Sequence, residues 1–182
     1  MKKGRLFIVV GPSGAGKDTL IAGAKALHPD LHWARRVITR AEVAGGEPYE
    51  GVSLADFDDR RDAGEFALHW QAHGLSYGVP FVEIRPLDAG HDVLINGSRG
   101  AMAAALAAFP ELTVLRISAP SHILAERLAE RGRESKEDIL ARLARASYDL
   151  DARIPVIDIT NDASPEVGVA RLLSALYPNL AR

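Results

Sequence analysis

Apolar residues fall into short runs separated by polar or glycine-containing segments. The runs 6–10 and 93–95 are apolar throughout, which is typical of strands buried on both faces of a parallel sheet. Segments with capping residues and helical spacing stand between such runs. The predicted strands are 6–10, 33–38, 66–70, 93–95, 112–117 and 156–159, and the predicted helices are 17–27, 53–62, 101–109, 120–131, 135–150 and one that begins at Ser164-Pro165.

This alternation of strands and helices predicts an α/β fold, with a parallel sheet flanked by helices and joined by right-handed crossovers. Residues 33–90 break the alternation and are interpreted as an insert. Within the insert, residues 41–51 contain Gly45-Gly46 and Pro48, which predicts a mobile loop. At 182 residues the chain is expected to form a single domain.

A glycine-rich segment follows the first strand directly. It reads GPSGAGK over residues 11–17 and fits the pattern G-x-x-x-x-G-K between a strand and a helix. Glycines let the backbone bring its N–H groups onto phosphate oxygens, and the helix N-terminus adds partial positive charge. A lysine at the last position reaches the outer phosphates of a nucleotide. The residues predicted to contact ATP here are Gly11, Pro12, Ser13, Gly14, Ala15, Gly16, Lys17, Asp18 and Thr19.

One position departs from the pattern. After Lys17 a serine or threonine is expected, whose hydroxyl binds Mg²⁺, but Asp18 stands there and Thr19 follows. A carboxylate can bind magnesium directly or through water. It is equally compatible with an anion that merely stabilises the first turn of a helix. Both interpretations of Asp18 stay open at this point.

Charge and composition narrow the class of function. The 24 acidic and 22 basic residues give a net charge of −2, so no global basic field for nucleic acid or an anionic membrane is expected. The absence of cysteine excludes a disulfide scaffold, thiolate metal sites and a cysteine nucleophile. The chain shows neither a signal peptide nor an apolar run of membrane-spanning length, which predicts a cytoplasmic protein. Of the 22 cations 17 are Arg, a bias explained by genome composition or by phosphate binding.

The order of motifs resembles the guanylate kinase superfamily of P-loop kinases over nearly the whole chain. The segments that carry the resemblance are GPSGAGK at 11–17, ITR at 38–40, GEPYEG at 46–51, HG at 73–74 with YG at 77–78, RLAERG at 127–132, ILARL at 139–143 and ITND at 159–162. The resemblance implies a kinase core over 1–32 and 91–182, an arginine-bearing lid over about 127–145, and an acceptor-binding insert over about 33–90.

Two departures from the superfamily pattern concern the acceptor. The guanine-binding carboxylate of guanylate kinases would fall near Leu68, which cannot accept a hydrogen bond from a base. The acidic segment after the middle strand is replaced by NGSRG at 96–100. With the Lys-Asp step at 17–18, these features are similar to the ribose 1,5-bisphosphate phosphokinase family. That family implies formation of 5-phosphoribosyl 1-diphosphate (PRPP) and ADP from ribose 1,5-bisphosphate and ATP, with Mg²⁺.

The resemblance also implies residue roles. An acceptor phosphate is mostly dianionic at neutral pH, so no catalytic base is expected and catalysis rests on positioning and charge neutralisation. Each arginine named below could instead be a solvated surface charge without a role in binding, and Asn161 could simply end a strand. The implied catalytic residues are Lys17, Arg131 and Arg142; the implied acceptor-binding residues are Arg36, Arg40, Tyr77 and Arg99; and Asn161 is implied to lie beside adenine.

Two other functions remain open on the sequence. A nucleoside monophosphate kinase, in particular a guanylate kinase, has Leu68 against it. An inactive guanylate-kinase-like interaction module would be expected to lose the loop lysine, whereas Lys17 is present. The expected partners are therefore a small sugar bisphosphate and ATP, without nucleic acid or membrane, and the oligomeric state is left open.

Overall fold

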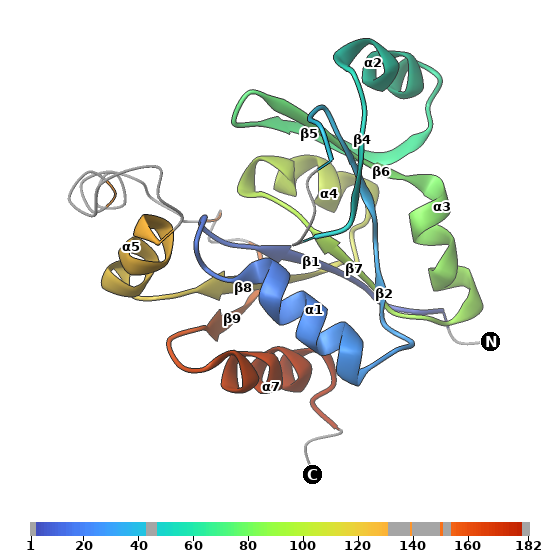
Figure 1. The fold of residues 1–182 in the computed structure, drawn as a ribbon. Helices are drawn as coiled ribbons and strands as arrows, with labels where there is room; N and C mark the ends of the chain where they lie inside the picture. The colour runs from blue at the N-terminus through green and yellow to red at the C-terminus, as the bar shows by residue number, and fades with distance from the viewer. Residues whose placement is uncertain (1–2, 43–46, 131–138, 140–149, 151–153, 180–182) are drawn as a thin grey trace.

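Two sheets organise the molecule (Figure 1). The computed structural model describes residues 3–42, 47–130, 139, 150 and 154–179. A five-stranded sheet has the order β2-β7-β1-β8-β9, and its neighbouring strands pair in parallel. Its strands are β1 (Leu6–Val10), β2 (His32–Trp33), β7 (Val93–Asn96), β8 (Thr113–Ser118) and β9 (Val156–Thr160). The predicted parallel sheet flanked by helices is confirmed.

The second sheet belongs to the predicted insert and has the order β4-β3-β6-β5. Strand β3 pairs parallel with β4 and antiparallel with β6, and β5 and β6 form a hairpin whose turn contains His73 and Gly74. Its strands are β3 (Arg36–Ile38), β4 (Tyr49–Gly51), β5 (Phe66–Ala72) and β6 (Leu75–Pro80). In Figure 1 this sheet lies above the central one, with α2 at the far end.

Helices cover the central sheet on both faces. Those described are α1 (Lys17–Leu27), α2 (Leu54–Asp62), α3 (Phe81–Ile84), α4 (Met102–Ala108), α5 (Ser121–Ala129) and α7 (Pro165–Leu176), with short 3-10 helices η1 (Arg85–Ala89) and η2 (Arg99–Ala101). Ser53 caps α2, because its side chain accepts a hydrogen bond from the Asp56 N–H. Among the described residues, no helix combines the length and the apolar character needed to cross a membrane.

The alternation of side chains along β1 explains why its sequence is apolar at every position. Phe7 and Val9 pack in the cluster that contains α1, α5 and α7, including Leu20 and Leu172. Their neighbours on the opposite face, Leu6, Ile8 and Val10, pack in a second cluster, which contains residues of α4, β5 and β6. Each such buried side chain contributes roughly 1.5–3 kcal/mol relative to exposure. The strand is thus held rigidly where the glycine-rich segment begins.

The predicted strand over 33–38 is wrong in one respect, because the structure divides it between the two sheets. Trp33 pairs with Leu94 in the central sheet, whereas Val37 pairs with Gly78 in the second. The exposed Arg35 separates the two, and its N–H donates to Glu83. Both halves are apolar and partly buried, so the hydrophobic pattern alone carries no sign of the change of sheet.

The predicted loop over 41–51 is also partly wrong. Its end forms β4, which pairs with β3 through Tyr49 and Arg36, and the Tyr49 hydroxyl donates to the Ala41 carbonyl at 2.6 Å. Residues 43–46 lie outside the described part of the chain. The helices α3 and η1 are additions that the sequence pattern did not predict. Of the predicted helix over 135–150 only residues 139 and 150 are described.

Candidate active site

The glycine-rich segment links the end of β1 to the start of α1, at the carboxyl edge of the central sheet. Gly16 is the N-cap of α1 and has φ 86°, a left-handed conformation that favours glycine. A Cβ placed on Gly16 would lie 2.6 Å from Nδ2 of Asn161. The turn therefore needs glycine at this position both for its backbone angle and for its close approach to Asn161.

Lys17 folds back over the loop that precedes it. Its Nζ donates to the carbonyl oxygens of Gly11 and Pro12, at 2.9 and 3.2 Å. The ammonium group is thus held above the loop by backbone oxygens and stays partly exposed. A nucleotide phosphate is a stronger, charged acceptor for the same group. Lys17 therefore lies directly at the loop, and its contact with a nucleotide phosphate stays a prediction.

A pocket of about 300 Å³ opens beside this loop. Its lining combines the loop, the first turn of α1, the end of α5, and the connection between β9 and α7. One of its guanidinium nitrogens, Nη1 of Arg127, is buried and has no hydrogen-bond partner among the described residues. The lining residues are Gly14, Gly16, Thr19, Leu20, Arg127, Glu130, Asn161 and Pro165. An unpaired buried donor in a pocket suits a ligand that brings an acceptor.

Asn161 holds the loop from the side of β9. Its Nδ2 donates to the Ala15 carbonyl at 2.8 Å, and its backbone N–H donates to Ser118. The side chain is buried between Gly16 and Gly168, each of which would clash with it if it carried a Cβ. The structure thus gives Asn161 a part in shaping the loop, and its contact with adenine stays a prediction.

Four polar side chains join the loop to the insert. Asn96, at the end of β7, donates through Nδ2 to Asp18 Oδ1 and to Glu47 Oε2, both at 2.7 Å. Glu47 accepts from Arg36 through both carboxylate oxygens, with the Nε–Oε1 distance at 2.5 Å. Burial raises the pKa of the Glu47 carboxyl above its usual value, while the neighbouring Arg36 charge opposes this shift. We call these residues the Asp18–Asn96–Glu47–Arg36 network.

The network ends against aromatic rings of the hairpin. Trp70 and Tyr77 stack with their ring centroids 5.3 Å apart and their planes nearly parallel, at 4°. The Arg36 guanidinium lies over both rings, 5.1 Å from the Tyr77 centroid and 5.8 Å from that of Trp70. Arg36 donates to Glu47 through Nε and Nη2, and its Nη1 is not part of that ion pair. The predicted acceptor residues Arg36 and Tyr77 are therefore in direct contact.

Leu68 is buried among apolar residues beside Trp70. Its side chain therefore offers no hydrogen bond where the superfamily resemblance expects a base-binding group. Arg40 is exposed, with its guanidinium 4.5 Å from the centroid of the Tyr49 ring. Its placement leaves the charge available to solvent or to an anion.

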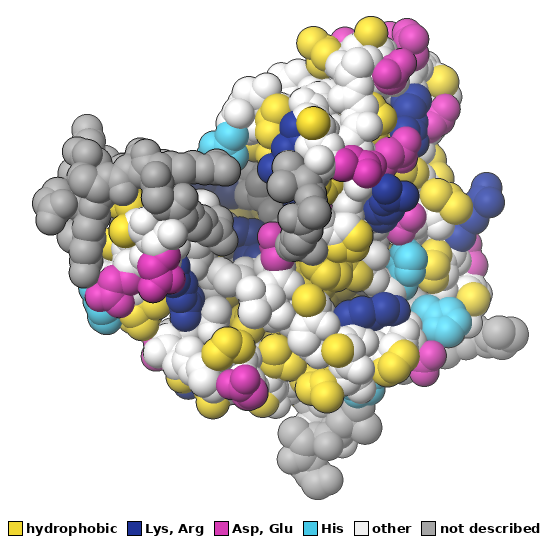
Figure 2. All heavy atoms as spheres, viewed as in Figure 1, with side chains coloured by type: hydrophobic (Ala, Val, Ile, Leu, Met, Phe, Trp, Pro, Cys, Tyr) yellow, Lys and Arg dark blue, Asp and Glu magenta, His cyan; other side chains and the backbone are white. Residues whose placement is uncertain are grey.

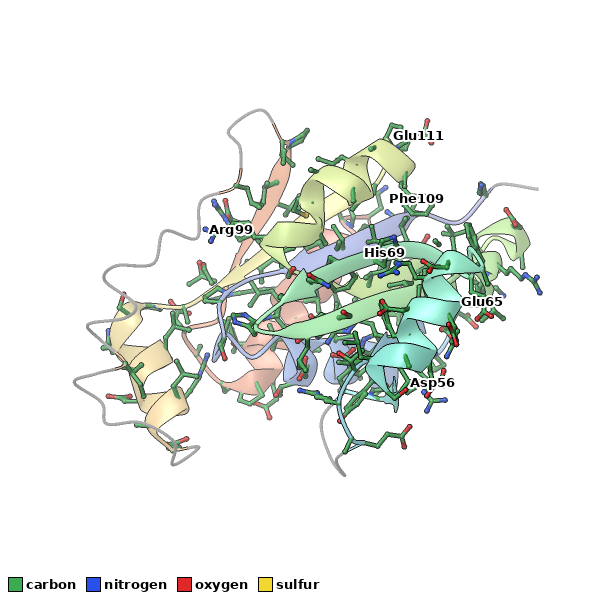
Figure 3. All side chains as sticks on the ribbon, turned by 90° about the horizontal axis from the view of Figure 1, so that it is seen from above. Asp56, Glu65, His69, Arg99, Phe109 and Glu111 are labelled. Carbon is green, nitrogen blue, oxygen red and sulfur yellow. The ribbon has the colours of Figure 1, made fainter. Side chains whose placement is uncertain are left out.

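Of the three remaining arginines with a predicted role, one is exposed and two lie outside the described residues. Arg99 is exposed and begins η2, and Figure 3 shows it near the start of α4, away from His69 on β5. Arg131 and Arg142 lie outside the described residues. Figure 2 shows a hollow between the part that carries α2 and the part that carries α1, with Lys or Arg atoms and an acidic side chain at its floor.

Known proteins resemble this chain over most of its length. Ribose 1,5-bisphosphate phosphokinase PhnN of Agrobacterium fabrum is 47% identical over 164 residues, covering 88% of this chain and 90% of the relative. The enzyme of the same name from Rhizobium etli is 45% identical over 184 residues, covering 99% and 93%. The chain belongs to the ribose 1,5-bisphosphate phosphokinase family. No protein-family model matches the sequence.

Some members of this family carry more than the kinase. A bifunctional ribose 1,5-bisphosphokinase-thymidine phosphorylase from Cupriavidus necator is 46% identical over 174 residues. The match covers 95% of this chain but only 29% of that relative, so the chain spans less than a third of its length. Among solved structures, a guanylate kinase from Anaplasma phagocytophilum superposes with a TM-score of 0.70 at 19% identity, covering 100% of this chain and 88% of that chain. This last likeness concerns the fold alone.

Three residues of this site had no role assigned from the sequence. Arg127 is the first residue of the segment RLAERG, and its place in the pocket follows from the position of the end of α5 beside the loop. Glu47 and Asn96 appear in the quoted segments, but neither spacing nor type shows that they meet. Their contact depends on a sheet-to-sheet arrangement that local sequence does not encode.

Proposed function

We propose that the protein transfers the γ-phosphoryl group of ATP to the 1-phosphate of ribose 1,5-bisphosphate, giving PRPP and ADP. The observation that carries the proposal is the identity of 45–47% to two enzymes named for this substrate, which this chain covers to 90% or more. The site supports it, because it combines a phosphate-binding loop with an acceptor side that has cations but an apolar Leu68.

On the nucleotide side, the loop N–H groups and Lys17 bind the ATP phosphates. Arg127 Nη1 and Asn161 lie in the adjoining pocket and contact the rest of the nucleotide. Asp18 fits a magnesium site by its chemistry, since it places a carboxylate in the first turn of α1 beside the loop. Asp18 would hold Mg²⁺ at this place, and the ion would supply positive charge that offsets the charge of the phosphates.

On the acceptor side, Arg36 and Arg40 bind one phosphate of the sugar and Arg99 binds the other. Tyr77 packs against Arg36 and limits the directions in which that guanidinium points. Arg131 and Arg142, from the lid, close over the transferring group. The attacking oxygen belongs to a phosphate that is largely deprotonated at neutral pH, so the site needs no base to remove a proton.

The proposal predicts a clear preference between two acceptors. Ribose 1,5-bisphosphate and GMP are offered separately with ATP and Mg²⁺, and the products are identified by mass. We expect PRPP and ADP from the sugar and little or no GDP from GMP, because the buried Leu68 cannot hydrogen-bond to guanine. Turnover of GMP without turnover of the sugar would replace this function by that of a nucleoside monophosphate kinase. We propose that the enzyme acts in the cytoplasm.

A further inference from the structure

Asn96 is the one described residue whose side chain bonds to both Asp18 and Glu47. The two carboxylates belong to segments 78 and 49 residues away from it in sequence. Asp18 stands in the first turn of α1, beside the nucleotide loop, and Glu47 stands in the insert just before β4. Asn96 is only 3% exposed, so these hydrogen bonds are screened from water. A short polar path thus connects the two halves of the site.

The path continues on the acceptor side through Glu47. Glu47 and Arg36 are each only 8% exposed, and the Glu47 carboxylate accepts two hydrogen bonds from Arg36. Bonds inside such a buried network depend on one another, since the low local dielectric strengthens each and penalises any unpaired group. A change at Arg36 therefore reaches Asn96 through a single residue.

Both carboxylates accept from Nδ2 of Asn96, one from each of its two N–H bonds, so a shift of the amide towards one carboxylate lengthens its bond to the other. A phosphate that binds Nη1 of Arg36 shares the guanidinium charge with Glu47 and leaves the Glu47 charge less compensated. Glu47 then relies more on Asn96, and the bond from Asn96 to Asp18 weakens. This frees an oxygen of Asp18 for a cation beside the nucleotide phosphates.

We propose that Asn96 is a positioning residue that couples the two substrate sites, so that the acceptor raises the affinity of the enzyme for Mg²⁺-ATP. The proposal rests on the function proposed above. By thermodynamic reciprocity the nucleotide raises acceptor affinity by the same factor. The benefit is that the charged groups reach their final arrangement only when both substrates are present.

The coupling is measured with the non-transferable analogue AMP-PNP and Mg²⁺ by isothermal titration calorimetry, with and without saturating ribose 1,5-bisphosphate. We expect the acceptor to tighten AMP-PNP binding about fivefold or more in the natural sequence, the low end of known coupling energies. In Asn96→Ala the factor should fall close to one. The exposed Asn179→Ala is the control and should keep the natural factor. A coupling factor unchanged in Asn96→Ala would overturn the proposal.

A second cycle needs no acceptor, so it separates this proposal from the proposed function. Glu47→Gln is tested for its effect on Mg²⁺-AMP-PNP affinity, once with Asn96 and once with Asn96→Ala. Because Glu47 is joined to Asp18 through Asn96, we expect a change of about threefold or more only where Asn96 is present. Equal changes in both backgrounds would show a through-space charge effect and refute the coupling. If Asn96→Ala does not fold, as judged by thermal unfolding, Asn96→Ser replaces it, since its side chain is too short to reach both carboxylates.

Discussion

Arg36 and Glu47 form a buried ion pair, in which Nε and Nη2 of the guanidinium donate to the two oxygens of the carboxylate. The pair orients an arginine that the account places at the acceptor phosphate, and the rings of Tyr77 and Trp70 restrict it from the side. An arginine fixed in this way loses little conformational entropy when a phosphate binds.

Removing the carboxylate from this pair should destabilise the fold. Glu47→Ala leaves the Arg36 charge buried and uncompensated, and we expect a loss of about 3–5 kcal/mol in the free energy of unfolding. Urea denaturation at pH 7 measures it. Glu50→Ala is the matched control, because Glu50 pairs with Arg60 at 42% side-chain exposure and should cost less than about 1 kcal/mol. Equal losses in the two variants would contradict the structural role of the buried pair.

Lys17 should be indispensable for phosphoryl transfer. Lys17→Ala removes the ammonium that the loop carbonyls hold in place, and we expect turnover to fall by about 10²–10³ with the fold intact. The control lies on the same helix: Lys25 donates to the Pro29 carbonyl at 2.7 Å, away from the loop, and Lys25→Ala should keep turnover. Steady-state kinetics with ATP and ribose 1,5-bisphosphate compare the two. Full activity of Lys17→Ala would refute the assignment of the loop.

Gly16 should tolerate no side chain. Gly16→Ala combines a left-handed backbone with a Cβ 2.6 Å from Asn161, so the loop must distort. A strain of ~1–2 kcal/mol in the binding conformation corresponds to about tenfold weaker ATP binding. Gly74 has φ 74° and open space around it, so Gly74→Ala shares the backbone strain without the clash. Calorimetric titration with AMP-PNP should show a loss for the first variant alone, and similar losses for both would argue against the loop geometry.

Arg99 should act on the acceptor rather than on ATP. Arg99→Ala is expected to raise KM for ribose 1,5-bisphosphate about tenfold or more, because a hydrogen bond to a charged group is worth ~1.5–3 kcal/mol. KM for ATP should change far less. Arg85→Ala, another exposed arginine that begins η1, serves as the control. A parallel rise in both KM values would remove Arg99 from the acceptor site.

The ion pair between Arg116 on β8 and Asp158 on β9 should make the stability of the fold depend on pH. Hydrogen bonding from Arg116 lowers the pKa of Asp158, so the unfolded state binds the proton more tightly. The stabilisation is therefore present above the ordinary pKa of about 3.9 and is lost as the pH falls through the lowered value. Asp158 is 54% exposed, so Asp158→Asn should cost less than about 1 kcal/mol at pH 7. Urea denaturation should show that the difference in stability between this variant and the natural sequence shrinks as the pH falls below the ordinary pKa, and a difference that widens on acidification would contradict the assignment.

Some parts of the fold can be predicted from the local sequence pattern, because their structure depends on residues close together in the chain. The apolar run of β1, the capped helix α2, and the glycine-rich turn before Lys17 all express their structure within a few residues. The division of 33–38 between two sheets could not be predicted, because Trp33 and Val37 are both apolar and differ only in their distant partners, Leu94 and Gly78.

In the candidate site, too, some features can be predicted from the sequence and others cannot. The loop residues and Lys17 follow from spacing, whereas the contact of Asn96 with Asp18 and Glu47 depends on where two sheets meet. Arg36 illustrates both situations. The family resemblance implies that it binds a phosphate, yet nothing in the sequence indicates that Glu47 pairs with it in the interior.

The proposed kinase activity is tested most directly by comparing the turnover of ribose 1,5-bisphosphate with that of GMP. Each is offered with ATP and Mg²⁺, and the products are identified by mass. The account predicts PRPP and ADP in equal amounts from the sugar bisphosphate, and little GDP. GDP formation from GMP with no PRPP from the sugar would contradict it.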